Sequence, residues 1–301
     1  MRRVGFALIF AIVEIGLAAS NPSASVPNDQ VHTLKLGSFV IHPPSPAGLI
    51  LKVRIDGGPV LRLLLDSGAQ FIVLDKTAAA RSGHSAGSEL DLVGVGRRPK
   101  AARMAKAGSV GIGDLVFHDC ELIVAEGRLL DGIDGVIPLS LFAGFLVRLD
   151  IPGKTLDLRP YPPGEPVGDG ELSHVRASNN LLFIKAVLNE FREGYVLLDT
   201  GAFVNAISES TARALKYTPA FAFPVKLQSG AGATEGMMLP SELRFRFGSR
   251  VVKANSVAVV PLDDLEQHHG MAVAGVLGYP ALRESILTID YRDGLVGIGT
   301  K

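Results

Sequence analysis

Two short segments of this sequence each place an aspartate directly after a run of leucines. The first segment is Asp66–Ala69, with the sequence DSGA, and the second is Asp199–Ala202, with the sequence DTGA. A buried, ionised carboxylate is costly unless hydrogen bonds or a shared proton compensate for it. The hydroxyl residue after each aspartate can donate a hydrogen bond, and the next glycine lets the backbone turn tightly and bring amide groups near the carboxylate. One such segment alone would indicate an ordinary turn, whereas two matched copies indicate a paired site.

A pair of aspartates has a specific chemistry if the two copies meet. Equivalent loops of two halves that pack about a pseudo-twofold axis lie on that axis, so the carboxylates of Asp66 and Asp199 would face each other. Two carboxylates this close cannot both ionise easily, and they share one proton. One then accepts a proton from a water between them, while the other donates to the carbonyl oxygen under attack. We therefore predict Asp66 and Asp199 as catalytic residues, without metal or cofactor, supported by the loop residues Ser67, Gly68, Thr200 and Gly201.

The elements around the two aspartates also occur twice, which indicates an internal repeat. A strand, a turn and a returning strand lead into each aspartate, over residues 49–65 in the first copy and 181–198 in the second. Asp75 and Ser208 then stand where each could cap a short helix. The aspartates are offset by 133 residues (199 minus 66) and later matching pieces by 140 (272 minus 132), so the second copy carries a seven-residue insertion. These later pieces are Gly132–Ile137 with Ala272–Leu277, and Val147–Asp150 with Leu287–Asp290.

The sequence predicts an all-β protein of two pseudo-symmetric lobes in one chain, each a closed or partly open β-barrel. Its 301 residues suffice for two compact units. The 34 Gly, 18 Pro and 47% hydrophobic residues are typical of a globular protein with many turns, and the single cysteine, Cys120, excludes an intrachain disulfide. Residues 160–171 are too rich in Pro and Gly for a central strand. We expect an N-terminal lobe over 35–159, this linker, and a C-terminal lobe over 172–301.

Charge and the N-terminus indicate partners and location. The 30 Lys and Arg residues balance the 30 Asp and Glu residues, so no net field attracts nucleic acid. Residues 1–24 match a secretory signal peptide and the start of the mature chain, with an apolar run over 4–13 and small residues that permit a cut after Ala19 or Ser20. We expect a periplasmic or secreted protein with no stable membrane span after cleavage. An uncleaved membrane anchor is the alternative, although the run is short for a bilayer and meets Glu14.

Each half also contains a pair of apolar strands with a glycine-rich tip that could close over a bound peptide. Glycines of this kind also occur in ordinary surface hairpins, but their equivalent placement in the two copies favours flaps. We predict two triplets as flap or substrate-contacting positions: Gly94, Val95 and Gly96 in the first half, and Gly230, Ala231 and Gly232 in the second.

These motifs together resemble those of retropepsin-like aspartic peptidases of the pepsin and retropepsin superfamily, in particular bacterial proteins with two such lobes fused in one chain. The matching pieces are the leucines followed by Asp66–Ala69, the leucines followed by Asp199–Ala202, and apolar-glycine elements around Gly135 and Gly275. The resemblance runs from Leu49 to the C-terminus and implies acid-protease lobes.

The resemblance also implies an activity. An aspartic endopeptidase of this type hydrolyses peptide or protein substrates as a monomer, because both aspartates belong to one chain. In that family the hydroxyls at the positions of Ser67 and Thr200 link the two loops across the axis, the later element threads the aspartate loop, and flaps close over an extended peptide. Two alternatives stay open: a catalytically silent peptide-binding module of the same fold, and a protease that processes only itself or a single partner.

Three features depart from the resemblance or imitate other chemistry. No tyrosine lies between Leu90 and Val110, where pepsin-like enzymes carry one on the flap, so glycine-tipped viral-type flaps are the closer match. Asp134 replaces an aliphatic residue, and it either lies near the pair as a third acid that raises the pair's pKa or faces solvent beside a turn. His268 and His269 follow acidic residues but lack a helix-spaced ligand pair, so we predict a solvated loop and no metal site.

Overall fold

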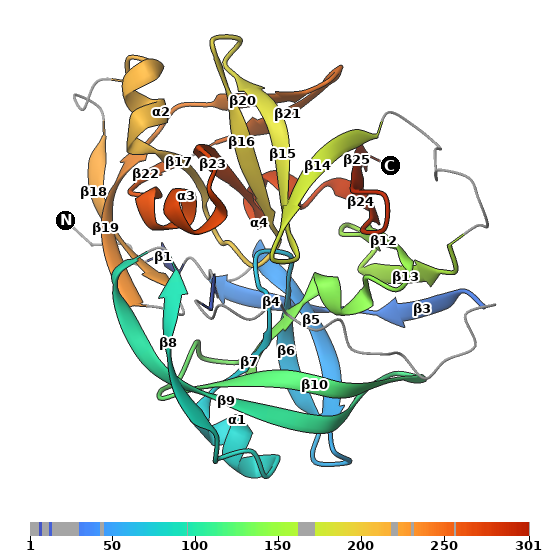
Figure 1. The fold of residues 1–301 in the computed structure, drawn as a ribbon. Coiled ribbons are helices and arrows are strands. Elements are labelled where there is room, and N and C mark those ends of the chain that lie inside the picture. The colour runs from blue at the N-terminus through green and yellow to red at the C-terminus, as the bar shows by residue number, and fades with distance from the viewer. Residues whose placement is uncertain are drawn as a thin grey trace.

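The protein is built almost entirely from β-strands. The computed structural model describes residues 6–7, 12–13, 30–42, 45–94, 96–161, 172–217, 222–229, 232–255 and 257–300. These residues form a 16-stranded and a 9-stranded sheet. In Figure 1 the blue and green N-terminal half and the yellow to red C-terminal half form two lobes on either side of a central region. The predicted all-β, two-lobed fold is confirmed.

The N-terminal half of the chain contributes mostly strands, two short helices, and two strands of two residues each near the N-terminus. Its elements are β1 (Phe6–Ala7), β2 (Ile12–Val13), β3 (His32–Lys35), β4 (Gly37–His42), β5 (Ser45–Ile55), β6 (Leu61–Asp66), β7 (Ile72–Leu74), α1 (Lys76–Arg81), β8 (Ser88–Gly94), β9 (Gly96–Ile112), β10 (Leu115–Ala125), β11 (Gly135–Pro138), the 3-10 helix η1 (Leu139–Phe142), β12 (Leu146–Asp150) and β13 (Thr155–Arg159).

The C-terminal half repeats much of this order. Its elements are β14 (Ser173–Ser178), β15 (Leu181–Leu188), β16 (Arg192–Asp199), β17 (Asn205–Ser208), α2 (Glu209–Ala214), β18 (Phe223–Ser229), β19 (Gly232–Leu239), β20 (Leu243–Phe247), β21 (Arg250–Ala254), β22 (Val257–Val260), α3 (Asp263–His269), β23 (Val273–Gly278), α4 (Tyr279–Leu282), β24 (Ser285–Asp290) and β25 (Leu295–Thr300). Among the helices of the described ranges, none has the length and hydropathy that crossing a membrane requires.

The strands around the two aspartates follow the same order in both lobes. β11 lies between β6 and β7 in the first lobe, and β23 lies between β16 and β17 in the second. The short helix that follows begins at the predicted cap in each copy. Asp75 accepts a hydrogen bond from the N–H of Ala78 (2.7 Å), and Ser208 accepts one from the N–H of Thr211 (3.2 Å). Both predicted caps are therefore confirmed.

A pseudo-twofold axis relates the two lobes. It is visible where β12 of the first lobe pairs antiparallel with β24 of the second. Arg148 lies opposite Thr288, and these two positions are equivalent in the repeat because they are 140 residues apart (288 minus 148). Val147 lies opposite Ile289 on one side of this pair. Equivalent residues meet in this reciprocal way only where a strand crosses its own copy at the symmetry axis.

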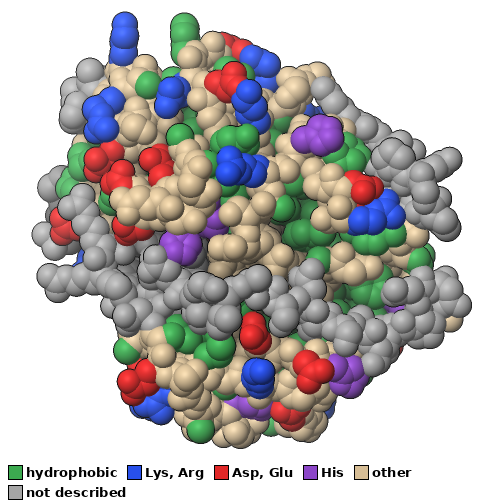
Figure 2. All heavy atoms as spheres, viewed as in Figure 1, with side chains coloured by type: hydrophobic (Ala, Val, Ile, Leu, Met, Phe, Trp, Pro, Cys, Tyr) green, Lys and Arg blue, Asp and Glu red, His purple; other side chains and the backbone are tan. Residues whose placement is uncertain are grey.

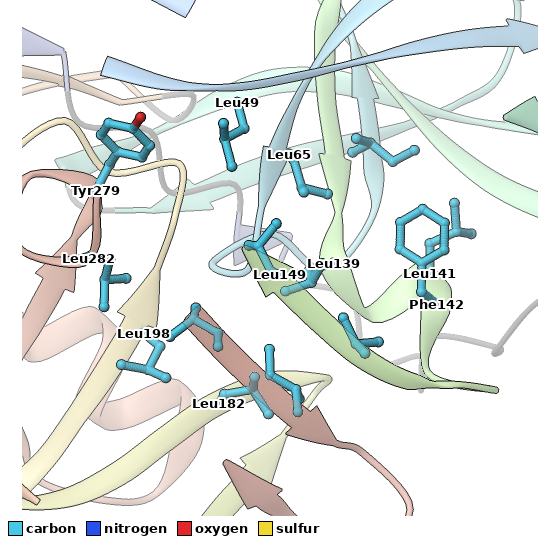
Figure 3. Packing of buried hydrophobic residues seen from close by; sticks show 14 of the residues in the cluster. Leu49, Leu65, Leu139, Leu141, Phe142, Leu149, Leu182, Leu198, Tyr279 and Leu282 are labelled. Atoms are coloured by element: carbon cyan, nitrogen blue, oxygen red, sulfur yellow. The ribbon is translucent and has the colours of Figure 1, made fainter. Parts of the chain in front are cut away.

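One hydrophobic core crosses the boundary between the lobes. Leu65 near the end of β6 and Leu198 near the end of β16 belong to the same buried cluster as Leu149 and Leu182. Figure 3 shows these side chains gathered from both lobes. Burying a leucine side chain contributes about 1.5–3 kcal/mol to stability. The shared core therefore holds the two aspartate-bearing strands in a fixed relation.

The second lobe carries an additional helix, α3, in the connection between β22 and β23. The prediction of a solvated loop at His268 and His269 was wrong, because residues 263–269 form this helix. Its inner face packs on the core through the buried Leu265 and His269, and the ring of His269 lies 4.9 Å from that of Phe183. His269 Nδ1 also lies 2.9 Å from Ser178 Oγ. An apolar face that spans one helical turn was the signal that the sequence prediction overlooked.

Candidate active site

The two aspartates stand at equivalent ends of equivalent strands. Asp66 ends β6 opposite Pro138 of β11, and Asp199 ends β16 opposite Gly278 of β23. Both side chains have an exposed fraction of 0%. The strands are apolar up to these residues because they cross the shared core, so each carboxylate marks the point where its strand leaves that core.

Four reciprocal hydrogen bonds join the two aspartate loops. The N–H of Ser67 donates to Thr200 Oγ1 (3.0 Å), and the N–H of Thr200 donates to Ser67 Oγ (3.0 Å). Each hydroxyl then donates to the carbonyl oxygen of the leucine before the opposite aspartate: Ser67 Oγ to Leu198 at 2.9 Å and Thr200 Oγ1 to Leu65 at 3.0 Å. All these groups are buried, so the bonds are protected from water and fix the distance between the loops.

The carboxylates lie against the loop glycines of both copies. The N–H of Gly68 donates to Asp66 Oδ1 (2.6 Å), and the N–H of Gly201 donates to Asp199 Oδ1 (2.9 Å). A Cβ atom added to Gly68 would stand 2.5 Å from Asp199 Cγ, and one added to Gly201 would overlap with the Asp66 carboxylate. Glycine is therefore required at both positions by the close approach of the opposite aspartate.

The second oxygen of each carboxylate has no N–H or O–H donor among the described residues. Burial raises the pKa of Asp66 from 3.8 to about 6. Burial first, and the charge of Asp66 second, raise the pKa of Asp199 well above 3.8. The two carboxyl groups interact directly, and two buried carboxylates in contact retain one proton between them, a rule whose best-known example is the aspartic proteases themselves.

The predicted flaps are hairpins in the structure. β8 and β9 form the first, with Gly94 opposite Gly96, and β18 and β19 form the second, with Ser229 opposite Gly232. β9 and β19 contact each other, so the hairpins of the two lobes meet. Contact of their tips with a substrate stays a prediction. Three of the six predicted positions lie outside the described residues, namely Val95, Gly230 and Ala231.

The suggestion that Asp134 is a third acid beside the pair was wrong. Its carboxylate accepts hydrogen bonds from the N–H of Arg62 (2.7 Å) and from the Arg81 guanidinium (2.8 Å). Arg62 stands near the beginning of β6, four residues before Asp66, which corresponds to about 13 Å along a strand. Asp134 therefore lies at the opposite end of the strand from the site and joins β6 to α1.

Asn205 is a residue near the site that sequence reasoning missed. Its Oδ1 accepts a hydrogen bond from the N–H of Gly278 (3.0 Å), next to Asp199, and its side chain is buried. The equivalent residues of the first lobe are Ile72 and Pro138. Proline has no N–H to satisfy, so an apolar residue suffices there, whereas Gly278 requires an acceptor. A single asparagine in an otherwise apolar strand was the available signal.

Metal chemistry has no visible support in the described part of the chain. Within it, no group of three or more His, Cys, Asp or Glu side chains is arranged to hold an ion. The paired carboxylates thus act through protons, which the raised pKa values of Asp66 and Asp199 make available.

Comparison with known proteins defines the class. The fold is that of the aspartic proteinases: the crystal structure of the aspartic proteinase from Irpex lacteus has a TM-score of 0.55 at 13% sequence identity, over 90% of this chain and 98% of that chain. The family model of aspartyl protease matches residues 51–139 and 184–281, which include both aspartate loops. The chain therefore belongs to the aspartyl protease family, as the sequence predicted. None of the curated proteins matches the sequence significantly.

Proposed function

We propose that this protein is an aspartic endopeptidase in which Asp66 and Asp199 activate one water molecule. A single observation carries the proposal. One oxygen of each carboxylate is held by a glycine N–H of its own loop, while the other oxygen of each has no protein donor. These two remaining oxygens can bind a water and the substrate carbonyl without breaking any bond that supports the loops.

The hydrolysis needs only the single proton of the pair. The ionised carboxylate accepts a proton from the water, whose oxygen forms a bond to the carbonyl carbon of the peptide. The protonated carboxyl group donates its proton to the carbonyl oxygen. The tetrahedral intermediate then collapses as the C–N bond breaks, the leaving amine takes up a proton from the pair, and the initial protonation state returns. No covalent bond to the enzyme forms.

The proposal extends to partners and location. The substrate is a peptide or protein, and one chain suffices for activity because both carboxylates belong to it. On the face shown in Figure 2, Lys and Arg side chains lie interspersed with Asp and Glu side chains on both lobes, which supports the absence of nucleic acid as a partner. We further propose that residues 1–24 direct export to the periplasm or the medium, as their basic start and apolar run indicate.

The test is cleavage of a complex peptide mixture, read by mass spectrometry. Asp66→Asn and Asp199→Asn should each lower the rate by about 10²–10⁴-fold or more, the usual contribution of acid–base catalysis. The matched control is Asp131→Asn, because Asp131 is a surface aspartate with 90% side-chain exposure, and it should leave the rate unchanged. Undiminished activity in either site variant would contradict the proposal. Peptide binding without turnover at any pH would instead identify a silent binding module, and a cut confined to the protein's own N-terminus a self-processing protease.

A further inference from the structure

Two short strands near the N-terminus pair with the outer edges of both flap hairpins. β1 (Phe6–Ala7) runs parallel to β18, with Phe6 opposite Leu227. β2 (Ile12–Val13) runs antiparallel to β8, with Ile12 opposite Val93. Both strands occupy the outermost position of their sheet, β1 beside β18 and β2 beside β8 (Figure 1). One stretch of the chain therefore adds a strand to the flap of each lobe.

The directions of these pairings follow from the symmetry. β8 and β18 are equivalent strands, since each follows the capped helix and leads into the flap tip. A twofold axis between them reverses their direction along a line perpendicular to the axis. A peptide has only one direction, so a peptide that crosses the axis must meet one strand parallel and the other antiparallel. β1 and β2 show this combination, and the segment thus passes from one lobe to the other across the axis on which the aspartates lie.

An edge strand with free N–H and C=O groups binds another extended chain readily. Adding a peptide strand to such an edge obtains affinity from main-chain hydrogen bonds. We propose that the edges of β8 and β18 form one two-sided binding site for an extended apolar peptide, and that the chain's own N-terminal segment, Phe6–Val13, is its occupant. The peptide lies with its N-terminal part on β18 and its C-terminal part on β8.

The composition of the segment defines the ligand class. Residues 4–13 carry no charge, whereas Arg2 and Arg3 precede them and Glu14 follows. The strand edges offer apolar neighbours at the paired positions, such as Leu227 and Val93. The site therefore takes an uncharged, apolar stretch of about eight residues, which spans at most about 28 Å when extended.

The inference rests on the proposed function only where it concerns activity. If the pair of aspartates cleaves peptides, a substrate must compete with the N-terminal segment for the flap edges. Removal of the segment, by the cut that the sequence predicts near Ala19 or Ser20, would then raise activity. Binding to the edges does not require catalysis, so it can be measured separately.

The experiment weakens the internal strands in the full-length chain and measures binding of a free peptide. Phe6→Pro combined with Ile12→Pro places prolines, which lack the N–H that strand pairing uses, in both short strands. The probe is a fluorescent synthetic peptide of residues 4–13 with added terminal lysines. In an Asp66→Asn background, where turnover is stopped, the double-proline variant should bind it at least about tenfold more tightly than the chain with the native segment, because a ligand that fills the site most of the time lowers the apparent affinity of a competitor by its occupancy.

The matched control probe is the same peptide with alternate backbone amides methylated, which cannot add to a sheet edge and should not bind. Equal affinity of both chains for the unmodified probe, or equal binding of the methylated probe, would overturn the inference. Activity in the Asp66-containing chain is a separate measurement. Tighter peptide binding without any cleavage would leave the site in place and contradict the proposed function alone.

A second measurement does not depend on how the proline variant folds. Ile12→Cys with Val93→Cys joins paired positions, and under mild oxidation the two should form a disulfide in most molecules. Ile12→Cys with Ser88→Cys, at the far end of β8, is the control and should remain reduced. Disulfide formation at equal rates in both variants, or in neither, would contradict the pairing of β2 with β8.

Discussion

The two lobes agree closely at the symmetry axis and differ away from it. At the axis, Ser67 and Thr200 exchange equivalent hydrogen bonds, and β12 pairs with its own copy β24. Away from it, β9 runs unbroken from Gly96 to Ile112, whereas the second lobe has two shorter strands, β19 and β20, in this part. The second lobe also inserts α3 before β23.

The difference shows where symmetry is physically required. A residue at the axis contacts its own copy, so a change in one lobe disturbs a contact that both lobes share. A residue in the outer strands contacts only its own lobe and can change alone. The following variants test whether the two copies respond alike at the axis, from the largest expected effect to the smallest.

The reciprocal loop bonds should give equal and large losses of stability. Thr200→Val leaves the N–H of Ser67 without its acceptor and the Leu65 carbonyl without its donor, and Ser67→Ala does the same in the other direction. An unsatisfied buried group costs about 1–3 kcal/mol, so each variant should lower the free energy of unfolding by about 3–4 kcal/mol in urea denaturation. Thr200→Ser keeps the hydroxyl and serves as control. A loss in only one of the two variants would break the equivalence of the loops.

The buried pair should make stability depend on pH. A carboxyl group whose pKa rises on folding stabilises the fold fully below its unfolded value and loses this contribution as pH rises through the folded pKa. For Asp66 the rise from 3.8 to about 6 corresponds to about 3 kcal/mol. Relative to Asp199→Asn, the wild type should therefore lose about 3 kcal/mol of unfolding free energy between pH 4 and pH 7.5, measured by urea denaturation at each pH. Parallel curves for the two proteins would contradict the shared proton.

The loop glycines should be equally sensitive in activity. Gly68→Ala would push a methyl group against Asp199, and Gly201→Ala would push one against Asp66. A displaced catalytic group typically costs about 100-fold, so kcat/KM should fall by about this factor in each variant. Gly144→Ala is the matched control, since an added Cβ there meets nothing within 4 Å. Retained activity in one of the two site variants would show that the carboxylates are not equivalent.

The smallest effect concerns a difference between the lobes beside the site. Asn205→Ile copies the residue of the first lobe, Ile72, but leaves the N–H of Gly278 without an acceptor. The free energy of unfolding should fall by about 1–2 kcal/mol. An unchanged thermal midpoint would show that this hydrogen bond does not account for the asparagine.

Much of the fold could be predicted from repetition alone. The strand–turn–strand units, both helix caps and the hairpins recur in order, and two copies of a weak local pattern restrict the topology more than one. The placement of Asp66 with Asp199 followed from the same symmetry. In each case the prediction depended on local spacing, which a single sequence displays directly.

The missed features depend on register and long-range packing instead. Asp134 stands close in sequence to an element beneath the site, yet the parallel pairing of β11 with β6 places it at the other end of the strand. The burial of His269 requires Phe183, which is distant in the sequence. The pairing of β1 and β2 with the two flaps joins the N-terminus to edges that exist only after both lobes have formed.

The most direct test of the central claim is a double-mutant cycle on peptide hydrolysis. If Asp66 and Asp199 act as one proton-sharing unit, Asp66→Asn, Asp199→Asn and the double variant should lose activity to nearly the same extent, because either substitution already removes the unit. Retention of full activity by either single variant, or losses that simply multiply in the double variant, would contradict the account.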